Sequence, residues 1–489
     1  MNDTVRVKPI LALAAAATLG AGCASTTHLK DAETHYYAGE YKAAAESARA
    51  RLSGLETPEE RGTQPLILDN LYAGAASFMA GDEAAAAEAF ERAAEGIAEQ
   101  DDSTFGSGYP TRTYDVSMAA NYKALALWAD GDVDGARVAF RLTADAQERA
   151  DDRNARAIRK AEDEAEQRKA DETAKAESDA SEKGGSAGGA ISFFMNALST
   201  GDVKKEVDDF VGEYSSWSVY DNFQVPSTWF LDGLFALANA EMASDLEHAS
   251  YASRKALGML PSAPAKRVYD FAEARADGKI PAKALDKVFA VVFENGLGPE
   301  IEERRFDIPV PYEGRVYMLS FALPKLVRRD AAYPKIVVRS GAVSLGETVP
   351  VAELDKVVVR EFKSRLPGIV ASQIFEAVVK VAVQAAIVKA VEQKGGAQAA
   401  FLVSLATSAA SSALTGTDTR HWNLLPKDIQ AFVWKKPKTK NREIELWVPG
   451  AVQPLAKVAL PEKGLSVVYV KVPAPGLPPL VKILGEPAK

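Results

Sequence analysis

The chain has 489 residues, of which 47% are hydrophobic, a composition that allows a sizeable buried core and two or three domains. Its net charge of −9 argues against nucleic acid as a partner. The single cysteine excludes an internal disulfide framework, and its predicted lipidation removes it as a thiolate metal ligand.

The N-terminus has the features of a bacterial lipoprotein signal. Two basic side chains are followed by an apolar run at residues 9–19 and by a Gly-Ala-Gly run directly before Cys23. This order predicts a signal peptide over residues 1–22, whose removal leaves Cys23 bonded through its sulfur to diacylglycerol. A tether is expected over residues 23–30. The alternative is a plain secretory signal with an incidental cysteine.

The residue after the cysteine indicates which membrane would hold the anchor. It is Ala24, whereas an Asp at this place would resemble an inner-membrane retention signal. By that resemblance we expect a protein that is held in the outer membrane by the lipid on Cys23 and faces the periplasm. The apolar run is too short to span a bilayer as a helix.

Residues 31–280 predict a helical-repeat domain. A Gly-acidic turn recurs at Gly39, Gly81 and Gly131, with an alanine five residues after each glycine, and a weaker fourth copy lies at Ser244. Glycine ends one helix at positive φ, and the small alanine lets the paired helices approach closely. The pattern resembles irregularly spaced tetratricopeptide repeats, whose groove usually binds peptides or partner proteins. The alternative is a helical domain whose groove binds nothing.

A charged insertion at residues 150–190 interrupts these repeats. Ile158 is its only larger aliphatic side chain, so it has no apolar stripe with which to pack into a core. We therefore predict a solvated helix or exposed arm, with a partner-binding arm as the alternative. The glycine-rich run at residues 184–189 matches G-x-S-x-G by letter, but it follows a charged segment instead of a strand, which argues against a nucleophile elbow.

Residues 281–489 predict an α+β domain, which makes α+β the predicted fold class of the chain. Strand-like runs lie at residues 288–294, 315–321, 335–338, 443–448 and 466–472. Their alternation predicts an antiparallel β-sandwich or half-barrel with one solvated face. The last two runs flank a turn signal at residues 461–464, which predicts that they pair with each other.

Between these strands, residues 369–414 predict a helical hairpin that breaks at Lys394-Gly395-Gly396. Residues 395–417 carry no charge, and Ser404 and Ser408 belong to a row of small residues at four-residue spacing. Such a row permits close contact between helices. We expect a buried hairpin. The alternative is an outer-membrane pore or secretion component that inserts this segment.

Two short blocks of specific residues stand out in the C-terminal half. They comprise Glu294, Asn295, Gly296, Gly298 and Pro299, and then Asp418, Arg420, Trp422, Leu425 and Pro426. Asp418 and Arg420 are expected to pair their charges and Trp422 to plug the sheet, with a ligand site as the alternative. Together with the repeat pattern, the blocks resemble a family of uncharacterised bacterial outer-membrane lipoproteins with a tetratricopeptide-like N-terminal half. That resemblance implies an envelope location and carries no assigned reaction.

No pattern of catalytic residues accompanies these features. The four histidines, at positions 28, 35, 248 and 421, share no metal-ligand spacing, and the motifs H-E-x-x-H and S-x-x-K are missing from the sequence. We therefore expect no enzyme, cofactor or metal. The predicted function is a lipid-anchored periplasmic scaffold or adaptor in cell-envelope or surface-polymer assembly, which binds envelope proteins through its helical groove. The oligomeric state stays open.

Overall fold

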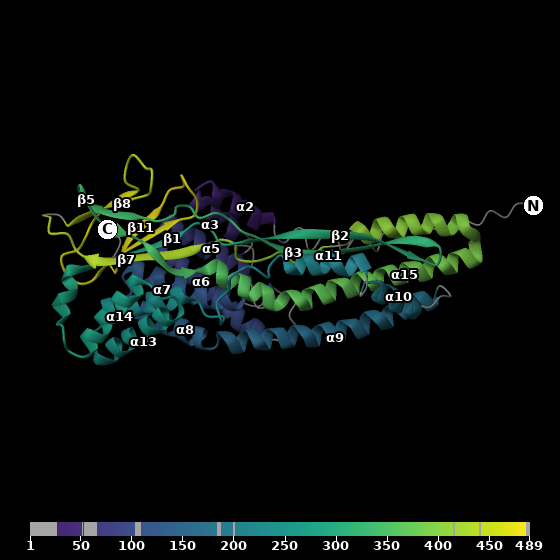
Figure 1. Cartoon of the computed structure of the whole chain (residues 1–489), viewed down its shortest axis with the longest axis horizontal. Coiled ribbons are helices and arrows are strands. Elements are labelled where there is room, and N and C mark those ends of the chain that lie inside the picture. Colours follow the sequence, from purple (N-terminus) through teal and green to yellow (C-terminus); the bar gives the residue numbers. More distant parts are fainter. Residues whose placement is uncertain are drawn as a thin grey trace, which may run out of the picture.

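The computed structural model describes residues 27–50, 52, 66–102, 109–182, 187–198, 201–413, 416–439 and 442–485. The predicted α+β fold class is confirmed: helices make up the N-terminal half, and largely antiparallel sheets lie in the C-terminal half. The molecule is elongated, with a thick body at one end and a long arm at the other (Figure 1).

Successive antiparallel helices form the N-terminal part of the body. They are α2 (Thr27–Tyr37), α3 (Tyr41–Arg49), α5 (Ile67–Ala80), α6 (Glu83–Asp102), α7 (Thr113–Asp130), α8 (Val133–Glu148), α12 (Pro226–Ala238), α13 (Ala243–Met259) and α14 (Ala263–Ala276). The first helices of three pairs, α5, α7 and α12, are buried over almost their whole surface, whereas α8 and α13 are buried along a single stripe. The first helices are therefore covered on both sides.

The glycine turns of the predicted repeats lie where the sequence places them. Gly39, Gly81 and Gly131 have φ of 78°, 79° and 88°, and each ends the first helix of a pair. Side chains other than glycine rarely adopt this conformation. The fourth turn was placed wrongly, because Ser244 lies in the first turn of α13, and the connection between α12 and α13 is at residues 239–242.

A five-stranded sheet forms the centre of the body, in the order β11-β10-β1-β7-β6. Its strands are β1 (Val288–Asn295), β6 (Val349–Glu353), β7 (Asp428–Lys435), β10 (Ser466–Val472) and β11 (Leu480–Leu484). The central pair β1–β10 is parallel and the other pairs are antiparallel. Every residue of β1 and β10 is buried, so both faces of the sheet are covered.

A four-stranded antiparallel sheet packs on the outer face of the first sheet. It contains β4 (Val337–Ser340), β5 (Val343–Glu347), β8 (Glu443–Trp447) and β9 (Ala456–Ala459), in the order β5-β4-β8-β9. Side chains of both sheets, such as Phe289, Val468 and Leu446, share one apolar cluster. The predicted pairing of β8 with β10 is wrong. β9 pairs with β8, while the fully buried β10 lies between β1 and β11 in the other sheet.

The helix pairs cover the remaining face of the five-stranded sheet, so the body has three layers. Phe78 of α5 packs edge-on against Tyr469 of β10, with their ring centroids 5.6 Å apart. The sheet edge is also joined to the helices, because Gly485 donates from its backbone nitrogen to the carbonyl of Trp128 at 3.0 Å. One apolar core runs through both halves. The inner face of the helical repeats is therefore filled by the chain's own sheet.

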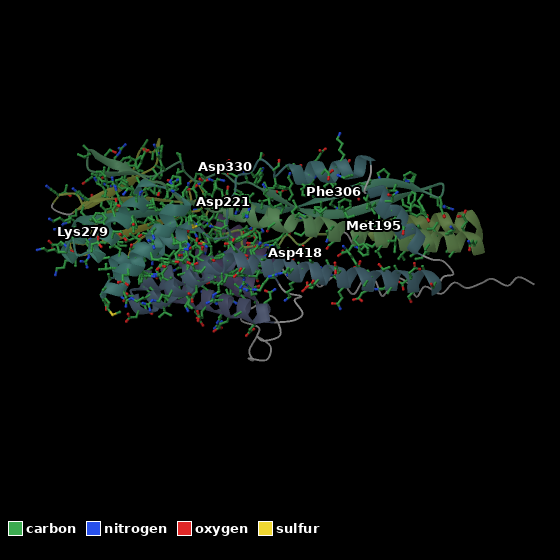
Figure 2. All side chains as sticks on the ribbon, turned by 60° about the horizontal axis from the view of Figure 1, so that its bottom comes forward. Met195, Asp221, Lys279, Phe306, Asp330 and Asp418 are labelled. Atoms are coloured by element: carbon green, nitrogen blue, oxygen red, sulfur yellow. The ribbon has the colours of Figure 1, made fainter. Side chains whose placement is uncertain are left out.

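The arm combines segments that lie far apart in the sequence. It contains α9 (Ala150–Glu182), α10 (Gly188–Leu198), α11 (Gly201–Gly212), the hairpin β2 (Glu300–Tyr312)–β3 (Arg315–Val327) and α15 (Leu354–Ala413). At about 1.5 Å per residue, the 33 residues of α9 extend about 50 Å. Figure 2 shows Met195 and Phe306 on the arm and Lys279 at the opposite end of the molecule.

The charged insertion forms the predicted helix, α9, but the prediction that it stays out of the core is wrong at its C-terminal end. Ala176 and Ala180 are buried against Val379 and Ala386 of α15. Two alanines four residues apart make a flat strip that lets another helix approach closely, so no large apolar stripe is needed.

The predicted helical hairpin corresponds to the outer part of α15, whose helical geometry is interrupted at Gly396, with φ 81° and ψ 174°. Its first limb is buried in the arm through residues such as Val378 and Val381. The side chains of Ser404 and Ser408 lie outside the described residues. Within the described part of the chain, no helix is both long and apolar enough to cross a membrane.

The predicted signal peptide and Cys23 also lie outside the described residues. The predicted tether over residues 23–30 is too long, because α2 already begins at Thr27. The last helix of the N-terminal half ends at Ala276, and a short 3₁₀ helix, η2 (Ala282–Lys287), leads into β1.

Candidate functional site

The two blocks of residues singled out in the sequence meet at the boundary between helices and sheet. Gly298 donates its backbone N–H to the carbonyl of Leu425 at 2.8 Å, and a Cβ on Gly298 would lie 3.5 Å from the carbonyl oxygen of Pro426. The backbone nitrogen of Lys427 donates to the carbonyl of Asn295 at 3.1 Å. We call residues 418–427 the strap, because they connect the end of the arm's long helix to β7.

Glu294, at the end of β1, belongs to a fully buried ion pair. Lys471 lies directly opposite it on the parallel strand β10, with 3.0 Å between Nζ and Oε2. The hydroxyl of Tyr122 on α7 donates to the same carboxylate oxygen at 2.6 Å and accepts from Lys471 at 2.8 Å. These three groups, which we call the triad, join one helix to two strands.

The triad is enclosed by aromatic rings, including those of Tyr36, Phe78 and Tyr469. Burial lowers the pKa of Lys471 and raises the pKa of Tyr122 well above its usual range. Because all three groups are sealed from solvent, this arrangement holds the two halves of the body together and offers no access for a substrate.

Asn295 and Gly296 fix the turn that follows β1. The side chain of Asn295 donates to the carbonyl of Tyr333 at 2.8 Å and accepts from the backbone nitrogen of Tyr333 at 3.0 Å. Asn295 also donates to Asp428 at 3.1 Å, and burial raises the pKa of that carboxyl to about 6. Gly296 has φ of 65°, and a Cβ there would lie 3.0 Å from the backbone nitrogen of Ala332. The motif therefore specifies a tight backbone crossing.

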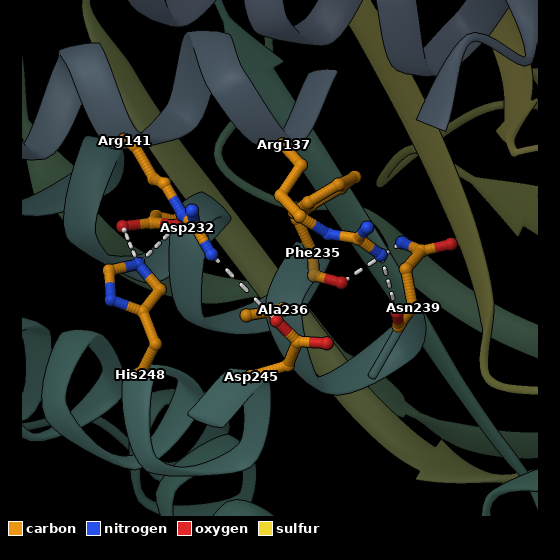
Figure 3. Close-up of a pocket in the computed structure, with 8 residues that line it drawn as sticks. All are labelled: Arg137, Arg141, Asp232, Phe235, Ala236, Asn239, Asp245 and His248. Atoms are coloured by element: carbon orange, nitrogen blue, oxygen red, sulfur yellow. Dashed lines mark hydrogen bonds and ion pairs between the residues drawn. The ribbon is translucent and has the colours of Figure 1, made fainter. Parts of the chain in front are cut away.

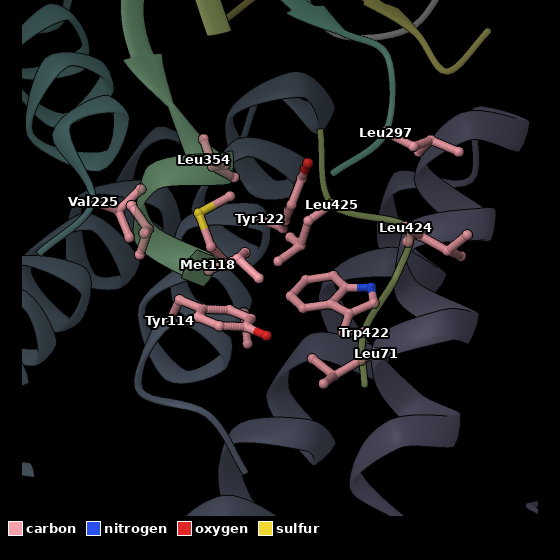
Figure 4. Close-up of a cluster of buried hydrophobic side chains, with 14 of the residues drawn as sticks. Leu71, Tyr114, Met118, Tyr122, Val225, Leu297, Leu354, Trp422, Leu424 and Leu425 are labelled. Carbon is pink, nitrogen blue, oxygen red and sulfur yellow. The ribbon is translucent and has the colours of Figure 1, made fainter. Parts of the chain in front are cut away.

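The prediction that Trp422 packs into the sheet is wrong, because its indole packs between helices. Its ring centroid lies 5.8 Å from that of Phe90 on α6 and 5.7 Å from that of Tyr122 on α7. Figure 4 shows the indole among Leu71, Met118 and Tyr122. The next residue continues the contact, because Tyr72 of α5 donates to the side-chain oxygen of Asn423 at 2.7 Å. The strap thus lies against three helices of the repeat.

The other polar residues of the strap bind within the chain. Arg420 and Asp418 form the predicted ion pair, at 2.7 Å, in a partly exposed position. His421 is buried, with Nδ1 3.0 Å from the carbonyl oxygen of Thr419 and Nε2 3.3 Å from that of Pro299. Burial lowers the pKa of His421 to about 4, so the imidazole is neutral at pH 7. His421 therefore joins the two blocks as an uncharged core residue.

The base of the arm is fixed to the body beside the strap. Glu361 of α15 accepts the backbone N–H of Thr113 at 2.9 Å with both of its oxygens and pairs with Arg365 at 2.5 Å. On the strap itself, Lys427 forms an ion pair with Asp355 at the start of α15. Both contacts hold the first turns of the long helix.

A separate, open hollow lies between α8, α12 and α13 (Figure 3). It is lined by Arg137, Arg141, Asp232, Phe235, Ala236, Asn239, Asp245 and His248. Its volume of about 20 Å³ has room for one water molecule but not for a cofactor.

The floor of the hollow is a hydrogen-bonded histidine–aspartate pair that joins two helices. His248 of α13 places Nε2 2.9 Å from Oδ2 of the buried Asp232 on α12. Hydrogen bonding to Asp232 raises the pKa of His248, whereas burial raises the pKa of Asp232. Asp245 begins α13 by accepting the backbone N–H groups of Glu241 and Met242 at 3.0 and 3.1 Å. Both carboxylates therefore already have partners.

Arg141 differs from the other charged groups of the hollow. Its side chain is 61% exposed, and its nearest carboxylate oxygen, on Asp245, lies 4.0 Å away. Within the described residues, its guanidinium has no hydrogen-bond acceptor. Val138 and Leu142, which are 60% and 51% exposed, lie on the same side of α8, because residues three and four apart on a helix are neighbours. We call these three residues the α8 face.

Sequence reasoning located the motif blocks but missed their partners. Lys471 interrupts a run of apolar residues in β10. A lone lysine in an otherwise apolar, buried strand indicates an internal ion pair, so this partner could have been predicted from the sequence. The hollow has no comparable signal, since its residues come from three helices and no motif links them.

Comparison with protein-family models gives no match, and comparison with curated proteins gives none either. Among the described residues, no three His, Cys, Asp or Glu side chains are grouped so that they could hold a metal ion.

Proposed function

We propose that the protein is a lipid-anchored scaffold of the bacterial cell envelope, which binds another envelope protein through the α8 face. The observation that carries the proposal is the combination, on one helix, of the exposed Arg141, whose ion pair with Asp245 is long at 4.0 Å, and two exposed aliphatic side chains. Its natural complement is a partner segment with a carboxylate beside an aliphatic side chain.

The filled inner face of the repeats is the reason to place binding on an outer helix. Aromatic and polar contacts to the five-stranded sheet and the strap occupy the surface that the sequence suggested as a groove. A partner would have to displace Trp422 and open the core to bind there. The α8 face needs no such rearrangement.

The lipid anchor enters the proposal from the sequence. The signal-like N-terminus and Cys23 would hold the chain at the outer membrane, on its periplasmic side. Fractionation of a Cys23→Ala variant tests this part. Release of the variant from the membrane, or accumulation of its unprocessed form, is the expected result. Correct processing together with firm membrane attachment would contradict it.

Site-specific photocrosslinking tests the binding surface. A photoreactive amino acid at Val138 should give an adduct of one defined size with an envelope protein in cells. The adduct should disappear when Arg141→Glu is added, because the partner carboxylate then meets a like charge. The matched control places the same group at Val452, which is 96% exposed and lies after β8.

Two results would contradict binding at the α8 face. One is no adduct at Val138. The other is an adduct that also forms at Val452 or that persists in the Arg141→Glu background.

A further inference from the structure

The charged helix α9 changes sign along its length. Residues 153–161 contain four cations and no acidic residue, although the whole chain has a net charge of −9. Acidic residues come directly before and after this stretch, at positions 151–152 and 162–164. The basic stretch is about 10 Å long, at about 1.5 Å per residue. We call its four cations the basic window: Arg153, Arg156, Arg159 and Lys160.

The basic window lies on the solvent side of α9. Arg156 and Arg159 are exposed, and within the part of the chain that the structure describes neither forms an ion pair. Arg156 is three residues from both Arg153 and Arg159, and Lys160 follows four residues after it. Like charges at these spacings are neighbours on a helix and destabilise it. The window therefore does not serve the stability of α9, and an anion from outside the helix would compensate its charge.

The basic window continues the side of the chain that carries the α8 face. Backbone hydrogen bonds run across the join of α8 and α9, from Arg149 to Asp145 at 3.3 Å and from Arg153 to Arg149 at 2.8 Å. Figure 1 shows α9 leaving the body beside α8. Because the buried residues recur every three or four positions across this join, the exposed side also continues across it. The buried residues are Phe140, Thr143, Gln147, Ala150 and Asn154.

We propose that the partner bound at the α8 face carries an acidic segment that lies along the basic window. The inference rests on the proposed function and adds the chemistry of the partner. Leu142 and Arg156 are 14 residues apart, which is about 21 Å along a helix. The partner would therefore present an aliphatic side chain and, about 21 Å away, a short group of carboxylates. Three of the four cations are arginines, whose planar forks match carboxylates.

The acidic residues on both sides of the window favour a short protein segment over a membrane surface. Asp152 and Asp163 are exposed next to the window. An anionic bilayer or a long polyanion would bring its own negative charges against both of them. An acidic segment of about two helical turns fits between them, because each turn rises about 5.4 Å.

A fluorescently labelled hexaglutamate peptide tests the window in the purified full chain carrying Cys23→Ala. Its binding, measured by fluorescence anisotropy, should weaken by about tenfold or more when Arg156→Glu and Arg159→Glu are introduced together, because its carboxylates then meet like charges. The matched control combines Arg168→Glu with Lys175→Glu, at exposed positions among the acidic residues of the same helix. It makes the same change in net charge and should alter binding by less than about twofold.

Photocrosslinking of the full chain in cells connects the window to the α8 face. A photoreactive amino acid at Ala155, which is exposed beside Arg156, should give an adduct of the same size as the adduct at Val138. The Arg156→Glu and Arg159→Glu pair should remove the adduct at Ala155. The Arg168→Glu and Lys175→Glu pair should leave it in place.

Four outcomes would overturn the inference. Hexaglutamate could bind both double variants equally, or an adduct could form at Val138 with none of the same size at Ala155, which would leave the proposed function standing. The adduct at Ala155 could have the mass of two copies of this chain, which would make the window an interface between copies. Vesicles of phosphatidylethanolamine and phosphatidylglycerol could float the Cys23→Ala chain only while Arg156 and Arg159 are present, which would make it a lipid-binding surface.

Failure of the proposed function gives a different result from failure of this inference alone. If no adduct forms at Val138, the α8 face does not bind a partner, and the inference falls with it.

Discussion

Lys471→Met removes one member of the triad and leaves the carboxylate of Glu294 buried without its cation. Lys471 and Glu294 are almost completely inaccessible to solvent, and their charged atoms lie 3.0 Å apart. Breaking a buried pair from one side typically costs about 3–5 kcal/mol, because the remaining charge stays desolvated. We expect a loss of this size in the free energy of unfolding.

The expected change in melting temperature is small but measurable. At about 2.1 cal/mol/K per residue, a chain of 489 residues that unfolds as one unit has an unfolding entropy of about 1 kcal/mol/K. The loss then lowers the melting temperature by about 3–5 °C in differential scanning calorimetry. Lys266→Met is the matched control, since Lys266 pairs with Asp270 on an exposed helix surface and should cost less than about 0.5 kcal/mol.

A triple variant separates the charge from the packing. Glu294→Leu, Lys471→Met and Tyr122→Phe together remove every polar group of the triad, so none is left unpaired. Apolar replacement of a whole buried network is often neutral or stabilising, and we expect the triple variant to be more stable than Lys471→Met alone. A neutral Lys471→Met, or a triple variant that is less stable than the single one, would refute this reasoning.

Three further predictions concern other parts of the body and arm. The pKa of His421 falls from about 6.5 in the unfolded chain to about 4 in the folded protein, so protonation favours the unfolded chain. Between pH 7 and pH 4, the free energy of unfolding measured in urea titrations should therefore fall by about 3 kcal/mol more for the native protein than for a His421→Gln variant. Equal losses in the two proteins would contradict this. Gly74→Ala places a Cβ 2.8 Å from a phenylalanine ring and should lower the free energy of unfolding by about 1–3 kcal/mol. Gly258→Ala is the control, because a Cβ there has nothing within 4 Å and should be neutral or stabilising. Equal melting temperatures of the two variants would contradict the close packing at Gly74. Ala180→Glu should detach the end of α9 and speed its proteolysis, while Ala174→Glu on the exposed side should not; equal proteolysis rates would show that this contact is unimportant.

The helix pairs could be predicted because their signals are local. Gly81 and Gly131 end helices at positive φ, and a glycine followed by an acidic residue marks that turn in the sequence. The strand β1 could be predicted for the same reason, since its first six residues, 288–293, are all apolar and buried and form a continuous stretch in the sequence. Local backbone chemistry was enough for these elements.

Long-range pairing could not be predicted in the same way. The turn before β10 suggested a hairpin with β8, but the short strand β9 pairs with β8, and β10 pairs with β1 from nearly 180 residues earlier in the chain. β2 was missed because its charges and its prolines, Pro309 and Pro311, hide the alternation of a strand. Prolines are tolerated there because β2 has only one neighbouring strand.

The candidate sites show the same difference between local signals, which the sequence contains, and long-range contacts, which it does not reveal. The sequence identified both motif blocks, and the structure brings them together through Gly298 and Leu425, but no sequence signal connects Glu294 with Tyr122 on a distant helix. Arg141 and His248 are ordinary helix-surface residues in the sequence. Only the packing of α8 on α12 and α13 makes them neighbours.

Hydrogen exchange measured by mass spectrometry under increasing denaturant tests the central claim most directly, namely that the inner face of the helical repeats is filled by the chain's own sheet and strap. The account predicts that peptides from α5 and α7 lose protection at the same denaturant concentration as peptides from β1 and β10, because Tyr122, Glu294 and Trp422 join them in one core. Helices that exchange well before the sheet would instead show an independent repeat domain with an open inner face, and would contradict the account.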